Sequence, residues 1–267
     1  MKIGLGFMHP ITFATWRCAL AGIAMLPVLY VTKARMPARQ KIWDYIILGL
    51  LQTTALFGLI LFGIQFVNAG KTAVLLYTMP IWTSLIAHFR LGEKLSLEGW
   101  LGIASGTLGI LSILGWDTLT QQSAAVLFGE LMVILGAIAW ALANIWMKTR
   151  MAGEDPRTAN GLQLLIGTLG LIVVAYGLEG GIWEVELTGM SLFTLLFTGI
   201  VASAVNFTIW FYLLRRMNTH MLGVSIMLVP VFGILFDFVV LGTKLDFGIM
   251  LGGGLIAYGI YKVAGQR

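Results

Sequence analysis

Long apolar stretches, separated by short polar connectors, fill the whole chain. Each stretch holds close to the ~20 mainly apolar residues that a helix needs to cross the hydrocarbon core of a bilayer. We therefore expect nine membrane-spanning helices, at residues 8–31, 45–66, 70–89, 99–116, 124–147, 158–178, 190–214, 219–241 and 247–262. The connectors between them carry turn formers and charges and leave no room for a soluble domain. This pattern predicts an all-α polytopic membrane protein.

A second pattern is an internal repeat, in which residues 68–110 return without a gap 150 positions later as residues 218–260. Leu91, Gly92, Lys94 and Leu95 face identical residues at that interval, and so does Pro80. The shift runs from the third span to the eighth, and an odd number of spans turns the copy upside down. The sequence thus predicts an inverted repeat of five-helix units, with residues 1–122 as the first and 123–267 as the second. Such repeats are typical of secondary transporters.

The first unit contains four of the nine helices and the second contains five. A further register supports this count, because Pro10 and Thr12 stand 146 residues before Pro156 and Thr158. Under this register Met1 aligns with the end of the fifth helix. Our hypothesis is that the first helix of the front unit is missing from this chain. The alternative is a genuine nine-helix protein with an external N-terminus.

Composition and charge agree with a membrane location. The chain is 58% hydrophobic and 11% charged, whereas about a quarter of residues are charged in soluble domains. Its net charge of +5 does not indicate a nucleic-acid partner, because the basic residues are spread over short loops. Thirteen of the 17 Lys and Arg residues fall on one side of the nine-helix arrangement, which predicts a multi-pass membrane protein with a cytoplasmic C-terminus.

Nothing in the sequence favours an enzyme or a bound cofactor. Cys18 is the single cysteine, and the three histidines lie far apart, so no metal site is expected. The glycines of the predicted helices at 99–116 and 247–262 form no nucleotide-binding loop, because no strand precedes them and no Gly-Lys-Ser or Gly-Lys-Thr follows them. Energy for transport would then come from a substrate gradient or from a proton or other ion.

Several local sequences resemble one family. These are Lys2-Ile3-Gly4-Leu5, His9-Pro10, Arg17, the run from Leu91 to Leu95, and the glycine-rich closing helices. Together with the five-helix duplication they are similar to the EamA family of the drug/metabolite transporter superfamily. The resemblance implies a ten-helix inner-membrane carrier, and many such carriers export amino acids or related metabolites. The chain departs from the pattern at its front and at Thr243, where a second Glu would often stand.

The predicted function is therefore a secondary transporter that exports amino acids or related small metabolites by alternating access. One alternative is a nucleotide-sugar transporter or a flippase for lipid-linked sugars, which would need a basic cavity or a lateral opening. Another is an inactive or accessory membrane subunit, which the missing helix keeps open.

Candidate substrate-binding residues are polar or aromatic and lie inside the spans, since such carriers bind substrate near the midplane. Trp140 and Asn144 are four residues apart on one helix, and Asn206 and Trp210 on another, so each pair shares a face. These faces would build an amide-and-aromatic cage, or the tryptophans would pack against lipid. The full set is Tyr77, Thr78, Trp82, Trp140, Asn144, Asn206, Trp210, Ser225, Gln52 and Arg17.

Other positions have coupling, gating or packing as their expected roles. Arg17 could hold a substrate carboxylate, but pairing with Glu130 is the leading expectation. Glu130 and Asp237 are candidates for proton coupling, and Glu93 with Lys94 for an intracellular gate or ion pair. Pro80 and Pro230 are expected to kink their helices. Glycines on the helices at 99–116 and 247–262 form small faces, on which the two helices would pack together or a homodimer would form in the lipid.

Overall fold

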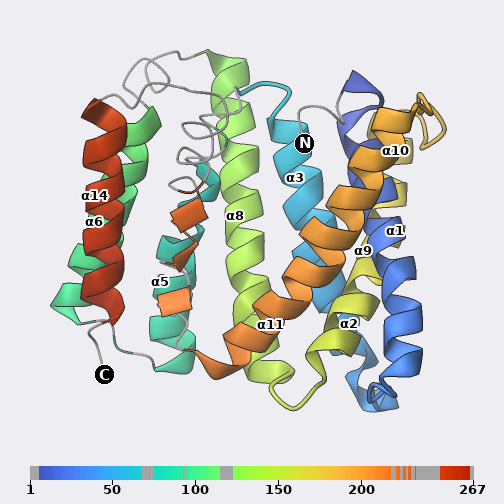
Figure 1. The fold of residues 1–267 in the computed structure, drawn as a ribbon, viewed down its shortest axis with the longest axis horizontal. Coiled ribbons are helices and arrows are strands. Elements are labelled where there is room, and N and C mark those ends of the chain that lie inside the picture. Colours follow the sequence, from blue (N-terminus) through green and yellow to red (C-terminus); the bar gives the residue numbers. More distant parts are fainter. Residues whose placement is uncertain are drawn as a thin grey trace. The chain divides into compact units, whose positions relative to one another are not determined.

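The computed structural model describes residues 6–67, 72, 75–92, 94, 96–114, 123–217, 221–222, 225–226, 228–229, 232 and 247–264. Among these residues the regular secondary structure is helical. They contain one isolated β-bridge, between Met8 and Val185, and no strand. The expected all-α fold is confirmed (Figure 1). Most of the predicted span at 219–241 lies outside the described residues, and so do Glu93, Asp237 and Pro230.

The chain forms two compact units that interleave along the sequence. Unit 1 comprises Met1–Phe62 and Leu142–Arg216, and unit 2 comprises Gly63–Ala141 and Met217–Arg267. This division follows packing and does not coincide with the predicted halves 1–122 and 123–267, which describe duplication and stay a prediction. The helices of unit 1 are α1 Pro10–Val31, η2 Arg39–Lys41, α2 Ile42–Gly49, η3 Leu50–Ala55, α3 Leu56–Gly63, α9 Pro156–Leu178, α10 Gly189–Leu196, η4 Phe197–Val205 and α11 Asn206–Arg216.

Unit 2 contains α5 Met79–Leu91, α6 Leu97–Leu114 and α14 Phe247–Ala264, and α8 Ala124–Arg150 passes from unit 2 into unit 1. By length and composition, five helical segments in the described part are able to cross a membrane: Pro10–Val31, Arg39–Gly63, Ala124–Arg150, Pro156–Leu178 and Gly189–Arg216. Each coincides with a predicted span to within a few residues. The largest shift is at Arg39–Lys41, where a polar 3₁₀ turn extends the helix before the apolar run.

In unit 1, carboxylate side chains cap helix N-termini by accepting hydrogen bonds from backbone N–H groups that have no partner within the helix. Asp155 caps α9 through the N–H of Arg157, directly before Pro156. The start of α1 is closed from a distance, because the Glu179 carboxylate accepts hydrogen bonds from the N–H groups of Ile11 and Thr12, both at 2.8 Å. Glu179 follows the last residue of α9, so this contact joins the beginning of α1 to the end of α9.

Helices α1 and α9 pack closely along their length and run in opposite directions. Near the other end of the pair, Gly161 of α9 lies against Met25 and Leu29 of α1. An added Cβ at Gly22 would stand 2.7 Å from a Leu165 methyl carbon, which shows how closely the two backbones approach. Small residues permit such approach between helices in a membrane.

The same close packing joins α6 and α14, which lie side by side in Figure 1. An added Cβ at Gly109 would come 2.6 Å from the Gly252 carbonyl oxygen, and one at Gly259 would come 2.5 Å from the Gly102 carbonyl oxygen. Gly102 and Gly109 stand 150 residues before Gly252 and Gly259, so the two contacts are reciprocal. The expected packing of these glycine faces is confirmed, and its reciprocity supports the predicted duplication.

Two spans of unit 1 contain a π-helical segment in the corresponding place. η3 and η4 are both π-helical, and residues 50–55 plus 150 give 200–205, which lies within η4. A π-helical turn interrupts the regular hydrogen-bond pattern of an α-helix, and such turns are frequent at functional sites. The interval of 150 residues between the two segments matches the interval of the sequence repeat. The inverted orientation of the repeat stays a prediction, which the antiparallel packing of α1 with α9 supports.

Pro80 does not kink a continuous helix as expected. Residues 75 and 76 are helical, Tyr77 and Thr78 form a turn, and α5 then begins at Met79, with Pro80 in its first turn. The first turn is where a missing N–H costs least. The break at Tyr77 and Thr78 replaces the predicted kink.

The glycine contacts of α14 generate a stability prediction. Gly259→Leu forces a side chain into the backbone of α6, whereas Gly253→Leu on the same helix meets nothing within 4 Å. We expect Gly259→Leu to destabilise the protein by about 1–3 kcal/mol relative to Gly253→Leu, which shares its gain in helix propensity. Thermal unfolding of the purified variants in detergent measures the difference. Equal melting temperatures would refute the close-packed interface.

Candidate functional site

Arg17 is a buried charged residue of unit 1. Its side chain projects from α1, the residue is 4% exposed, and Nε donates a hydrogen bond to Ser203 Oγ at 2.8 Å. The guanidinium carbon stands 4.5 Å from the centre of the Phe57 ring, a cation–π distance. Phe57 in turn meets Phe207 edge to face at 6.2 Å. The charge is therefore held between a hydroxyl and aromatic rings.

Within its unit Arg17 contacts no carboxylate in the described part of the chain. Ser203 Oγ is the hydrogen-bond acceptor of the guanidinium there, and the Ser203 hydroxyl in turn donates a hydrogen bond to the Thr198 carbonyl oxygen at 3.0 Å. Sequence analysis favoured Glu130 as the partner, but Glu130 belongs to unit 2. The contacts of Arg17 inside unit 1 are neutral, so its positive charge has no counter-charge there.

A second buried polar contact in unit 1 involves Thr53 and Gln163. Thr53 donates to the Gln163 side-chain oxygen at 2.5 Å, and the Gln163 amide donates to Asn160 Oδ1 at 3.0 Å. Asn160 then donates to the Ala204 carbonyl oxygen at 2.7 Å and to the Thr208 hydroxyl at 2.8 Å. This network ties η3, α9, η4 and α11 together, and each amide in it has partners on both sides.

The two contacts are counterparts under the repeat registers. Thr53 and Ser203 stand 150 residues apart, and Arg17 and Gln163 stand 146 apart, the interval that also relates Pro10 to Pro156. In both copies a side chain on the long helix bonds to a hydroxyl of a π-helical segment. One copy uses a neutral amide and the other a cation.

The copies differ further beyond this contact. Asn160 and Thr208, which continue the Gln163 network, correspond to Ala14 and Gly58 beside the other copy. Neither Ala nor Gly has a polar side chain, so the network that satisfies Gln163 has no equivalent for Arg17. The asymmetry leaves one buried cation with open hydrogen-bonding capacity.

Gln52 is a further buried polar group with unused capacity. Its residue is fully buried, and neither Nε2 nor Oε1 has a hydrogen-bond partner in the described structure. Its neighbours Thr53 and Thr54 instead bond to α9, at Gln163 and at the Gly167 carbonyl oxygen. Among Gln52, Thr53 and Thr54, only the Gln52 side chain has no hydrogen-bond partner in the described structure.

The expected meeting of the amide and tryptophan faces occurs in part. Trp210 Nε1 donates to Asn144 Oδ1 at 2.9 Å, which joins α11 to α8 within unit 1. Asn206 is exposed, and Trp140 belongs to unit 2. Their substrate role stays a prediction.

Unit 2 contains the other predicted site residues that the structure describes. Trp82 Nε1 donates to the Thr78 hydroxyl at 3.1 Å, and Thr78 donates to the Leu75 carbonyl oxygen, so two of the three candidates around the α5 break contact each other. Tyr77 is half-buried in the same break. Ser225 donates to the Met221 carbonyl oxygen, and Lys94 is exposed.

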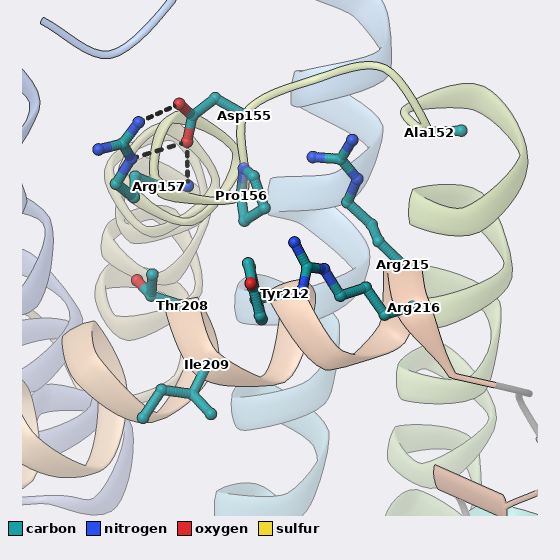
Figure 2. Close-up of a pocket in the computed structure, with 9 residues that line it drawn as sticks. All are labelled: Ala152, Asp155, Pro156, Arg157, Thr208, Ile209, Tyr212, Arg215 and Arg216. Carbon is teal, nitrogen blue, oxygen red and sulfur yellow. Dashed lines mark hydrogen bonds and ion pairs between the residues drawn. The ribbon is translucent and has the colours of Figure 1, made fainter.

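A cavity of about 600 Å³ opens where α9 begins and α11 ends (Figure 2). Arg157, Arg215 and Arg216 line it together with one acid, Asp155. Arg157 is bonded to Asp155 through Nη2 at 2.6 Å and Nε at 3.0 Å, and these bonds hold the pKa of the Asp155 carboxyl below its ordinary value. Sequence analysis placed these arginines in loops but did not bring them together. The described residues include no group of three potential metal ligands.

Comparison with known proteins identifies the family. The model of the EamA-like transporter family matches residues 1–115 and 127–264, which is nearly the whole chain. The chain belongs to the EamA-like transporter family. A transporter of Bacillus subtilis described as uncharacterized, YoaV, is 31% identical over 98% of this chain and 89% of its own length. The "probable amino-acid metabolite efflux pump" of Escherichia coli is 27% identical over 100% of this chain and 90% of its own.

One solved structure, described only as a crystal structure of a protein, shares the fold with a TM-score of 0.83 over 99% of this chain and 91% of its own, at 17% identity. The family assignment makes the protein a multi-pass membrane transporter with a small-molecule substrate. The EamA resemblance expected from the sequence is confirmed.

The sequence reasoning missed several residues of the unit 1 site: Phe57, Asn160, Gln163, Phe207 and Thr208. Phe57 is one of many apolar residues in its span and carries no distinguishing signal. Gln163 was detectable, because the 146-residue register that relates Pro10 to Pro156 also relates Arg17 to Gln163.

The Asp155 contact yields a pH prediction. The depressed pKa means that the ionised carboxylate stabilises the fold above its unfolded pKa of about 3.9, and that this stability is lost as pH falls through the lower folded value. Asp155→Asn keeps a capping oxygen but loses the charge, so we expect it to cost about 1 kcal/mol at pH 7 and progressively less as the pH falls from about 3.9 to 3 and below. Melting temperatures of both proteins across this range test the claim. A difference that does not change with pH would contradict it.

Proposed function

We propose that this transporter exports amino acids or related small metabolites by alternating access, and that Arg17 binds the substrate carboxylate. The observation that supports the proposal is the buried guanidinium of Arg17, which has a hydroxyl and a ring as its partners in unit 1. A charged side chain inside a span is costly and is a functional candidate by default.

The geometry of the guanidinium suits a carboxylate. Nε is used by Ser203, and the two terminal nitrogens have no hydrogen-bond partner in the described structure. Those nitrogens carry four of the five N–H groups of an arginine and match the two oxygens of a carboxylate. A bound carboxylate would supply the counter-charge that the fold of unit 1 omits.

Gln52 adds a neutral donor and acceptor to the same unit. Leaving a buried polar group unpaired costs about 1–3 kcal/mol, so a ligand that pairs with the Gln52 amide would recover part of that cost. An amino acid carries a carboxylate and an ammonium, which match a guanidinium and an amide oxygen. The name of the Escherichia coli relative, an amino-acid metabolite efflux pump, agrees with this substrate class.

The transport cycle that we propose uses the duplicated architecture. The two halves of the predicted repeat, residues 1–122 with four helices and residues 123–267 with five, would rock about a central site in the cell membrane, with the C-terminus in the cytoplasm. An ion or substrate gradient would supply the energy. The break before α5 and the two π-helical segments interrupt regular hydrogen bonding, as in carriers whose sites are formed by discontinuous helices.

Substitution of Arg17 tests the substrate role. Arg17→Gln removes the charge and is expected to lower amino-acid export by about thirtyfold or more, the effect of losing a buried hydrogen-bonded charge partner. Arg17→Lys keeps the charge without the planar fork and should fall between this variant and the wild type. Metabolites in the medium and in the cells, measured by mass spectrometry during expression, give the export rate.

Arg39→Gln is the matched control, because it removes an exposed arginine of the same unit. It should export like the wild type, and all variants should reach the membrane at equal levels. Undiminished export by Arg17→Gln would refute the proposed role of Arg17. Export of no amino acid or related metabolite by the wild type would refute the substrate class.

A further inference from the structure

The basic cavity of unit 1 lies at the boundary between membrane and water. Pro156 begins the span of α9 and Arg216 ends the span that contains α11, and both residues line the cavity. Figure 2 shows Arg215 and Arg216 extending from the end of α11 toward the segment before α9, with Tyr212 beside them. A ligand in this cavity would therefore sit at the depth of lipid headgroups.

The charges of the cavity do not balance among its described lining residues. Arg157 is matched by Asp155. Arg215 donates to the Glu154 backbone carbonyl oxygen at 2.8 Å, and the carboxylate of Glu154 instead accepts a hydrogen bond from the Tyr45 hydroxyl at 2.7 Å. Arg216 has as its contact the face of the Tyr212 ring, 4.2 Å away. Two guanidinium groups are thus available to an anion.

An apolar surface continues from the cavity along the same helix. Val201, Val205, Ile209 and Tyr212 are each about half exposed and recur at intervals of four, four and three residues, which places them along one side of η4 and α11. Ile209 and Tyr212 also line the cavity. The basic site and the apolar stripe are therefore continuous.

We propose that this cavity binds the headgroup of an anionic phospholipid, with the phosphate between Arg215 and Arg216 and an acyl chain along the stripe. Basic pockets between membrane helices attract anionic headgroups through charge, and arginine binds phosphate oxygens in a bidentate manner. A water-soluble anion would use the arginines but would gain nothing from the exposed stripe. Arg17 is not among the residues that line the cavity, and the proposal does not depend on the proposed substrate.

The test is native mass spectrometry of the full chain in detergent, with phosphatidylglycerol or phosphatidylcholine of identical acyl chains. Wild-type protein should retain phosphatidylglycerol preferentially. The double substitution Arg215→Gln with Arg216→Gln should weaken that binding by about tenfold or more, given about 1 kcal/mol for each basic residue. The matched control, Arg35→Gln with Arg39→Gln, removes two exposed arginines elsewhere in unit 1 and should bind like the wild type.

Two further measurements use the wild-type protein, so their outcome does not depend on whether a variant folds. They also distinguish a lipid headgroup from a free anion. Raising NaCl from about 0.1 M to about 1 M shortens the Debye length from about 10 Å to about 3 Å and should weaken phosphatidylglycerol binding to the wild type. Free glycerol phosphate and the exported amino acid should fail to displace the lipid at equal concentration.

The proposal is overturned if the double variant retains phosphatidylglycerol like the wild type, or if the control pair weakens binding equally. Displacement by glycerol phosphate would identify a site for a free anion instead, and displacement by the amino acid would assign the cavity to the substrate path. Salt-insensitive binding would show that charge does not hold the lipid.

Discussion

Buried polar contacts between a long helix and a π-helical segment hold unit 1 together, and both the packing of the unit and its candidate site depend on them. In the hydrocarbon region each polar group must find its partner inside the protein, because lipid offers none. Gln163 with Thr53 meets this demand in full, and Arg17 with Ser203 meets it in part at the equivalent place. Both contacts join a long helix, α1 or α9, to a segment whose own backbone bonding is irregular. The structural role and the functional candidate therefore coincide in the same residues.

The two contacts occupy equivalent positions of the repeat, so the difference between Arg17 and Gln163 is informative. Duplication alone would place similar side chains at both positions, and the hydroxyls of Thr53 and Ser203 are indeed similar. The long helices instead carry Gln163 in one copy and Arg17 in the other, and the Asn160 and Thr208 that complete the Gln163 network are matched by Ala14 and Gly58. A neutral, fully bonded network stabilises the fold, whereas an isolated cation is a poor stabiliser but a good receptor for an anion. The asymmetry thus separates packing from recognition.

Sequence reasoning succeeded where a physical rule has one outcome. An apolar run of about 20 residues has few fates other than a membrane span, and glycines repeated in register indicate close helix contact, as α6 and α14 confirm. The spacing of Asn144 and of Trp210 within their helices predicted faces that do meet. The π-helical segments could not be predicted, because one extra residue in a turn leaves no mark in composition. The arginines of the basic cavity come from separate connectors, and their meeting depends on how α9 and α11 pack.

The claim that Arg17 recognises a carboxylate is tested most directly by counterflow uptake in proteoliposomes. A labelled amino acid identified by the export assay would compete with itself, unlabelled, and with its primary amide, which differs only at the carboxylate. For the wild type we expect the acid to compete about thirtyfold better than the amide, and for Arg17→Gln we expect that preference to vanish. Equal competition by acid and amide in the wild type, or an unchanged preference in the variant, would contradict the account.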